Sequence, residues 1–325
     1  MAVTTLAGAL NQALRDAMAE DGSVVVYGED VGRLGGVFRI TDGLQEQFGA
    51  ERCFDTPVAE SGIVGSAVGM AIHGLRPVVE MQFEGFSYPA FDQVVSHVAK
   101  YRFRTRGAVS LPLVVRIPYG GGIGAVEHHS ESPEAIFAHI PGLAVVTPGT
   151  PGDAYSLLRA AIADPDPVVF LEPKRRYWMK EDVDLPVTTE PIGRAVVRRP
   201  GSTATVIAYG PMVATALEAA TAAKEDEGWE LEVVDVRSLS PLDIRTLTES
   251  AGRTRRAVVV HEASRHGGFG AEIAAELSEL LFSQLAAPVL RVTGYDVPYP
   301  PAHIEDHFLP DVDRILDAVA RSLRY

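Results

Sequence analysis

Segments with the pattern of a buried strand alternate with segments of helical period along most of this chain, and this alternation constrains the fold more than any other feature. Apolar residues at Leu6, Leu10, Leu14 and Met18 share one helical face, and the apolar run 24–27 follows as a strand. The succession continues with strands near 78–83, 113–117, 145–146 and 168–171 and helices near 61–72, 91–103 and 153–163. Strands that alternate with helices indicate an α/β fold with a buried parallel sheet.

The alternation is interrupted between Pro173 and about Arg199, where charged residues and prolines replace it, and it resumes beyond. Such a stretch is typical of an interdomain connection. A length of 325 residues also suits two domains. The sequence therefore predicts an α/β domain over residues 1–180, a linker over 181–199 and a smaller α/β domain over 200–325.

Charge and composition exclude several classes of protein. The chain has 29 basic and 43 acidic residues, and its net charge of −14 argues against binding to nucleic acid or to an anionic membrane surface. No apolar run approaches the roughly 18 residues of a membrane span, and the N-terminus lacks the features of a signal peptide, so we expect a cytoplasmic chain. The single cysteine, Cys53, excludes an intrachain disulfide and a cysteine-based zinc site.

The sequence signatures of several common enzyme sites are missing. The glycines that follow the first strand do not match G-x-G-x-x-G, and no P-loop or G-x-S-x-G motif occurs. His303 and His307 are four residues apart, but the residues between them do not match a metalloprotease motif. A dinucleotide site, a nucleotide-phosphate site and a zinc protease site therefore have little support.

Acidic residues and histidines at the ends of predicted strands are the candidates for chemistry, because ligands of open α/β sheets bind beyond the carboxyl ends of strands. Glu29 ends the first strand, and Glu60 precedes a helix rich in small residues. Glu60 is either a charge at a helix start or a proton carrier. His128 and His129 follow a glycine-rich run and are either proton-transfer groups or exposed loop residues. Phe86 either stacks on a flat ring or packs in the core.

Seven segments, taken in order, resemble the beta subunits of the thiamine-diphosphate-dependent 2-oxoacid dehydrogenases, the family that includes the pyruvate and branched-chain enzymes. The resemblance covers nearly the whole chain, and the order and spacing of the segments carry it. They are GEDVG at 28–32, DTPVAE at 55–60, QFEGF at 82–86, FDQVV at 91–95, HSESPEA at 129–135, DVRSLSPLD at 235–243 and GGFG at 267–270.

The resemblance implies a transketolase-like pyrimidine-binding domain with a parallel sheet, followed by a transketolase C-terminal domain, and it implies roles for individual residues. Glu60 matches the glutamate that activates the cofactor by exchanging a proton with its aminopyrimidine ring. Phe86 matches the aromatic residue that packs on that ring, with Val58 and Gln82 lining the same pocket. Glu29 matches a further acid near the cofactor. Branched-chain relatives often have tyrosine in place of Phe86.

His129 matches the histidine that handles protons as the acyl group passes to the lipoyl arm. Its neighbour His128 is the alternative, and the Ser-x-Ser-Pro sequence that follows favours His129. Both Glu60 and His129 are therefore expected to be catalytic.

The chain lacks the Gly-Asp-Gly motif with which single-chain thiamine enzymes hold magnesium and the diphosphate. The resemblance implies that an alpha subunit supplies these ligands and that two alpha and two beta chains form a heterotetramer, inactive without the alpha chain. It also implies docking on a lipoyl-bearing dihydrolipoyl acyltransferase core. Some relatives bind potassium through backbone carbonyls, and the sequence leaves that ion open.

Substrate choice depends on three stretches, 99–104, 132–135 and 171–174, which resemble branched-chain beta subunits more than pyruvate ones. We therefore expect a small branched-chain 2-oxoacid as substrate, with pyruvate or acetoin as the alternative. A non-catalytic assembly subunit with the same fold is a further alternative. A nicotinamide-dependent oxidoreductase is disfavoured by the missing glycine fingerprint.

Overall fold

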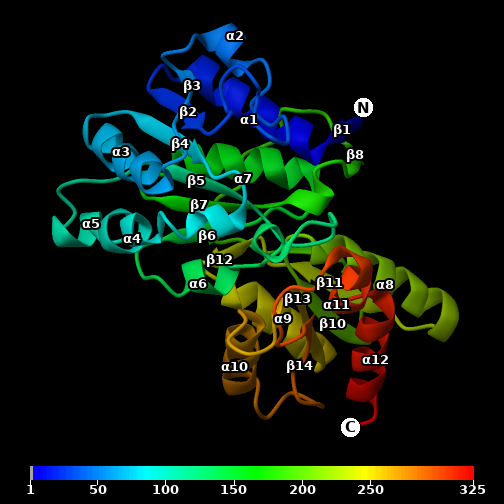
Figure 1. Cartoon of the computed structure of the whole chain (residues 1–325). Coiled ribbons are helices and arrows are strands. Elements are labelled where there is room, and N and C mark those ends of the chain that lie inside the picture. Colours follow the sequence, from blue (N-terminus) through cyan, green and yellow to red (C-terminus); the bar gives the residue numbers. More distant parts are fainter. Residues whose placement is uncertain (1–2) are drawn as a thin grey trace. The chain divides into compact units, whose positions relative to one another are not determined.

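A computed structural model describes residues 3–325, which divide into two compact α/β units (Figure 1). The N-terminal unit comprises the residues up to Tyr119 together with Ile136–Ile192. The C-terminal unit comprises Gly120–Ala135 together with Gly193–Tyr325. The segment that carries the two adjacent histidines therefore belongs to the C-terminal unit. The predicted α/β fold class is confirmed.

Six strands of the N-terminal unit pair in parallel in the order β6-β7-β5-β4-β2-β3. Every residue of β2 and β5 is buried, which explains why these strands are continuous apolar runs in the sequence. A separate short strand, β1, pairs antiparallel with β8. The bounds are β1 Val3–Thr5, β2 Val24–Gly28, β3 Cys53–Asp55, β4 Arg76–Glu80, β5 Val114–Tyr119, β6 Ala144–Val146, β7 Val168–Pro173 and β8 Lys180–Asp182.

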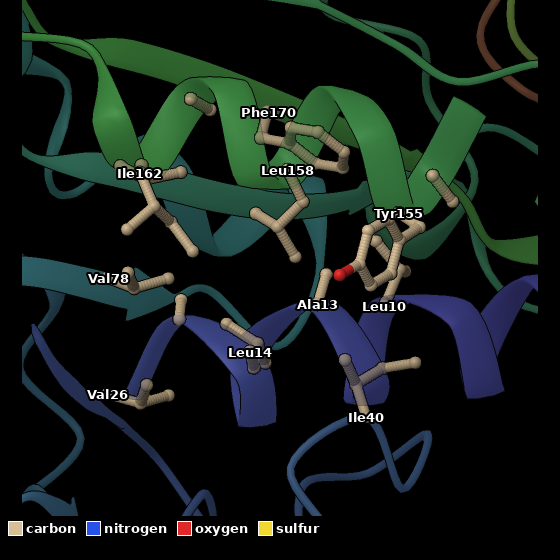
Figure 2. Close-up of a cluster of buried hydrophobic side chains, with 14 of the residues drawn as sticks. Leu10, Ala13, Leu14, Val26, Ile40, Val78, Tyr155, Leu158, Ile162 and Phe170 are labelled. Carbon is tan, nitrogen blue, oxygen red and sulfur yellow. The ribbon is translucent and has the colours of Figure 1, made fainter. Parts of the chain in front are cut away.

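Helices α1 (Leu6–Glu20) and α7 (Pro151–Ala163) pack against each other and build much of the core of this unit. Figure 2 shows Leu14 of α1 facing Leu158 of α7, and Leu10 of α1 near Tyr155 of α7. All of the apolar residues predicted to share one face of the first helix are buried, so that prediction is confirmed. At the start of α1 the hydroxyl of Thr5 accepts a hydrogen bond from the Gly8 amide, which fixes where the helix begins.

The helix predicted over 91–103 is interrupted in the structure. A π-helical turn, η2 (Val94–Val98), separates α4 (Phe91–Gln93) from α5 (Tyr101–Arg104). The Ala99 amide donates to the Val94 carbonyl over 2.9 Å, which inserts one extra residue into the helical repeat. The Ala99 carbonyl lies against Gly142 so closely that any side chain there would overlap it. The single-helix prediction was therefore wrong, because a tertiary contact that leaves no periodic signal shapes this segment.

The other helical segments before β9 are shorter than α1 and α7, apart from α3, which follows β3, and one of them, η3, belongs to the C-terminal unit. Their bounds are α2 Leu44–Phe48, α3 Glu60–Ile72, η1 Glu84–Ser87, η3 Glu127–His129, α6 Glu134–Ala138 and η4 Lys174–Arg176.

The C-terminal unit has a five-stranded sheet in the order β14-β13-β10-β11-β9, parallel except for the edge strand β9. The closing amphipathic helix predicted over 312–323 is present as α12, where the Asp311 side chain accepts from the Arg314 amide. The bounds are β9 Val196–Arg199, β10 Ala204–Ala208, α8 Met212–Glu227, β11 Leu231–Asp235, β12 Ser238–Ser240, α9 Ile244–Thr254, β13 Ala257–Ser264, α10 Gly270–Leu280, β14 Leu290–Gly294, η5 Ala302–Ile304, α11 Glu305–Phe308 and α12 Val312–Leu323. Within residues 3–325, no helix combines the length and apolar character needed to span a bilayer.

Candidate active site

Three neighbouring parallel strands of the N-terminal unit end beside one another, and most of the predicted site residues follow them. Strand β2 lies between β3 and β4. Glu29 comes directly after β2, Val58 and Glu60 follow β3, and Gln82 follows β4. Because parallel strands have their carboxyl ends at the same edge of the sheet, these side chains gather at one edge, where ligands of such sheets bind. We call it the carboxyl edge.

Two acidic side chains lie close together at the carboxyl edge. Glu29 is 6% exposed, and Glu60, the first residue of α3, is 9% exposed. Burial raises the pKa of Glu29, and the negative charges of Glu60 and Asp30 raise it further. The Oε1 atom of Glu29 is buried and has no hydrogen-bond partner among the described residues. These two acids can therefore accept hydrogen bonds from donor groups of a ligand, or exchange a proton with the ligand.

The loops that carry these acids are tied to each other by side chains. Gln82 donates to Asp30 Oδ2 over 3.0 Å, and the Gly32 amide donates to Asp55 Oδ1 over 2.6 Å. Asp30 has φ +58°, a left-handed conformation that costs energy for a residue other than glycine. The predicted pocket residue Gln82 is thus oriented by a residue that the sequence did not single out.

Phe86 lies on η1, and a buried ion pair fixes that turn. Lys174 Nζ is 2.6 Å from Glu84 Oε2, and both side chains are fully buried. The Phe86 ring meets Phe83 edge to face at 5.9 Å and is half-buried. Val58 is 81% exposed. Phe86 and Val58 therefore offer apolar surface to a ligand or to a second chain.

A buried charge network in the same unit was missed by the sequence reasoning. Arg116 of β5 is fully buried and donates to Glu80 Oε2 and to Glu172 Oε1, both over 2.7 Å. The Tyr177 hydroxyl donates to Glu172 Oε2 over 2.6 Å. Burial raises the pKa of Glu80, and Arg116 opposes that rise. An arginine inside an otherwise apolar strand was the available signal, because a buried charge requires a partner.

The histidines lie in the C-terminal unit, on η3. The rings of His128 and His129 meet edge to face with centroids 4.4 Å apart. His128 is exposed, with Nδ1 3.9 Å from a Glu127 carboxylate oxygen, whereas His129 is half-buried. The structure thus brings Glu29 and Glu60 together at the carboxyl edge of one unit and places the histidines in the other.

The carboxyl edge has the hydrogen-bond acceptors and the apolar surface that suit a flat heteroaromatic ring bearing an amino group. The unpartnered oxygen of Glu29 can accept from an amine, Glu60 can share a proton with a ring nitrogen, and Phe86 is an aromatic residue that is only partly buried. Within the described range, no cluster of three or more histidine, cysteine or acidic side chains is arranged to bind a metal ion.

Comparison with known families assigns both parts of the chain. Residues 3–179 match the model of the transketolase pyrimidine binding domain, and residues 193–315 match that of the transketolase C-terminal domain. The acidic pair and Phe86 lie within the first match.

Individual relatives cover nearly the full length of the chain. It is 59% identical to the 3-methyl-2-oxobutanoate dehydrogenase subunit beta of Mycobacterium tuberculosis, covering 98% of this chain and 92% of the relative. It is 54% identical to the pyruvate dehydrogenase E1 component subunit beta of Leifsonia xyli, covering 98% and 94%. Among solved structures it is similar to a split gene transketolase, described as an inactive beta4 tetramer, with a TM-score of 0.79, 26% identity and 97% coverage of each chain.

Proposed function

The chain belongs to the beta subunits of the 2-oxoacid dehydrogenases, and from this premise we propose that it works with an alpha subunit on a branched-chain 2-oxoacid. The reaction is oxidative decarboxylation followed by transfer of the acyl group to a lipoyl group. The observation that carries the proposal is the buried acidic pair Glu29 and Glu60 at the carboxyl edge, together with the half-buried Phe86 on η1, which follows the neighbouring strand β4.

Thiamine diphosphate fits this edge through its aminopyrimidine ring. Glu60 would hold or release a proton at the ring, Phe86 would contact the ring face, and Val58 and Gln82 would line its surroundings. Glu29, whose pKa is raised by burial and by Glu60, adds a second acid to the same place. When bound, the cofactor supplies the electron sink that decarboxylation of a 2-oxoacid needs.

We assign the ligands of magnesium and of the diphosphate to the alpha subunit, because this chain has no Gly-Asp-Gly motif. The working assembly is then a heterotetramer of two alpha and two beta chains, with potassium as a further ion that backbone carbonyls could hold. This heterotetramer would deliver acyl groups to a lipoyl-bearing dihydrolipoyl acyltransferase core. A net charge of −14 is compatible with a basic docking domain on that core. The buried free thiol of Cys53 fits a reducing compartment such as the cytoplasm.

We assign to His129 the handling of protons as the acyl group passes to the lipoyl arm. Its half-buried position, in contrast to the exposed His128, supports the choice between the two. Partial burial limits the number of orientations that the His129 ring can adopt. General acid–base catalysis requires such a fixed orientation of the proton-transfer group.

The test is turnover of 3-methyl-2-oxobutanoate, pyruvate and acetoin by this chain co-expressed with its alpha partner, with thiamine diphosphate and magnesium. We expect the branched acid to be preferred and neither chain to be active alone. A preference for pyruvate or acetoin would retain the chemistry and overturn the substrate, since small apolar differences in a pocket discriminate by only about 1–3 kcal/mol. A stable, cofactor-binding complex without turnover would favour the assembly-subunit alternative.

A further inference from the structure

A buried glutamate of the C-terminal unit binds the glycine-rich segment that leads to the histidines. Glu305, at the start of α11, is 6% exposed. Its Oε1 accepts from the Gly122 amide over 2.7 Å, and its Oε2 accepts from the Gly124 amide over 3.0 Å. The Tyr299 hydroxyl donates to the same carboxylate over 2.6 Å. Hydrogen bonds to an ionised acceptor are stronger than those between neutral groups.

The glycines are the residues that this contact requires. Gly122 and Gly124 have φ of +86° and +69°, a region that side chains disfavour. A side chain at Gly121 would overlap the Tyr299 hydroxyl and ring. The run Gly120–Gly124 therefore follows a defined path along Tyr299 and Glu305.

The same segment continues to His129 and closes on itself. The Gly120 amide donates to the Glu131 carbonyl over 2.9 Å, which joins the two ends of the loop. Within the loop the His129 amide donates to the Val126 carbonyl over 3.0 Å. Beyond it Glu134 is fully buried and accepts from the Tyr209 hydroxyl over 2.8 Å. His129 is thus held between the Glu305 contact on one side and the Glu134 contact on the other.

We propose that Glu305, with Tyr299, is a positioning residue for His129 during transfer of the acyl group to the lipoyl arm. This inference rests on the proposed function. Glutamine at position 305 keeps the shape of the side chain but loses the charge, and one of its terminal atoms becomes a donor facing an amide donor. The loop would then be free to shift, and displacing a reacting group by about 1 Å can cost about a hundredfold in rate.

The experiment compares E305Q with the matched control D306N, which alters the exposed neighbouring acid, in the assembled alpha–beta complex. Two rates are measured: acylation of a lipoyl domain, and decarboxylation coupled to an artificial electron acceptor, which does not use the lipoyl arm. We expect E305Q to lower lipoyl acylation about 10- to 100-fold, with dye-coupled decarboxylation at the D306N level. Y299F removes one donor to the carboxylate and should give a smaller loss in the same step.

A double-mutant cycle separates positioning from general destabilisation. If Glu305 acts through His129, E305Q should cause no further loss of acylation in an H129A background. Equal losses of lipoyl acylation and dye-coupled decarboxylation in E305Q would overturn the inference. Additive losses in the double-mutant cycle would also overturn it, and so would a rate of lipoyl acylation in E305Q equal to that in D306N. Absence of lipoyl acylation in the wild-type complex would instead overturn the proposed function on which it rests.

Discussion

Replacing Arg116 with methionine should leave two carboxylates buried without their main partner in the N-terminal unit. Arg116 and Glu172 are fully buried, and Glu80 is 4% exposed. Methionine fills similar space but donates no hydrogen bond. Glu172 retains the Tyr177 hydroxyl, whereas Glu80 loses its ion pair. Removing one partner of a buried ion pair costs about 3–5 kcal/mol, so R116M should lower the free energy of unfolding by about that amount.

The measurement is denaturant unfolding of the purified chain at one fixed protein concentration, with R102M as the control. Arg102 forms an ion pair of 2.6 Å with Asp166, but the side chains are 47% and 42% exposed, so its loss should cost at most about 1 kcal/mol.

The loss of unfolding free energy in R116M, its deficit, should also depend on pH. Burial raises the pKa of Glu80 in the folded state, and removal of Arg116 raises it further. Stability linked to a raised pKa is present at low pH and lost as pH rises, so the deficit should shrink on acidification.

Two results would refute this reasoning. A deficit of R116M equal to that of R102M would mean that the network contributes no more than an exposed pair. A large deficit that is the same at every pH would mean that lost packing, and not uncompensated charge, is the cause.

Three further predictions concern single positions. In the assembled complex, E60Q should lower the rate of decarboxylation about 10²- to 10⁴-fold. The control E46Q, which changes an exposed glutamate, should not lower it. Turnover by E60Q at the wild-type rate would show that Glu60 is not the proton-transfer residue. F86A should weaken thiamine diphosphate binding in titration calorimetry by about 1 kcal/mol, while F86Y retains it; equal affinities of F86A and wild type would exclude the ring contact. Burial raises the pKa of Glu134 to about 8, so its contribution to stability is complete at acidic pH and is lost as pH rises through that value. E134Q should therefore flatten the fall of melting temperature between about pH 5 and pH 9, and an unchanged profile would contradict the assignment.

The main elements were predictable from the sequence because each has a local signal. Strand β2 is buried throughout and appears as an uninterrupted apolar run. Helix α12 has one apolar face and an aspartate cap, and its predicted bounds are confirmed. Helix α9 was not predicted although Asp243 caps it, because it buries few apolar residues and its sequence is mostly polar.

Contacts between distant residues were not predictable. Glu305 contacts the amide of Gly122 across 183 positions of the chain, and no local pattern encodes that contact. The sequence therefore shows only a glycine-rich run, whereas the structure shows that the amides of Gly120, Gly122 and Gly124 are hydrogen-bonded. Likewise the positions of Glu29 and Glu60 at strand ends could be inferred from the alternation, but not the electrostatic coupling between them.

The carboxyl edge combines features that a chain alone does not favour, which supports the proposal of a shared site. Val58 is 81% exposed, Phe86 is half-buried, and a buried oxygen of Glu29 lacks a partner among the described residues. Apolar surface exposed to water and a buried polar atom without a hydrogen bond both cost free energy. A bound ring and an adjoining chain would offset these costs. A site of this kind gains stability from the groups that complete it, and the raised pKa of Glu29 depends first on its burial away from water. The physical state of these side chains thus supports the proposed dependence on an alpha subunit, as does the missing diphosphate motif.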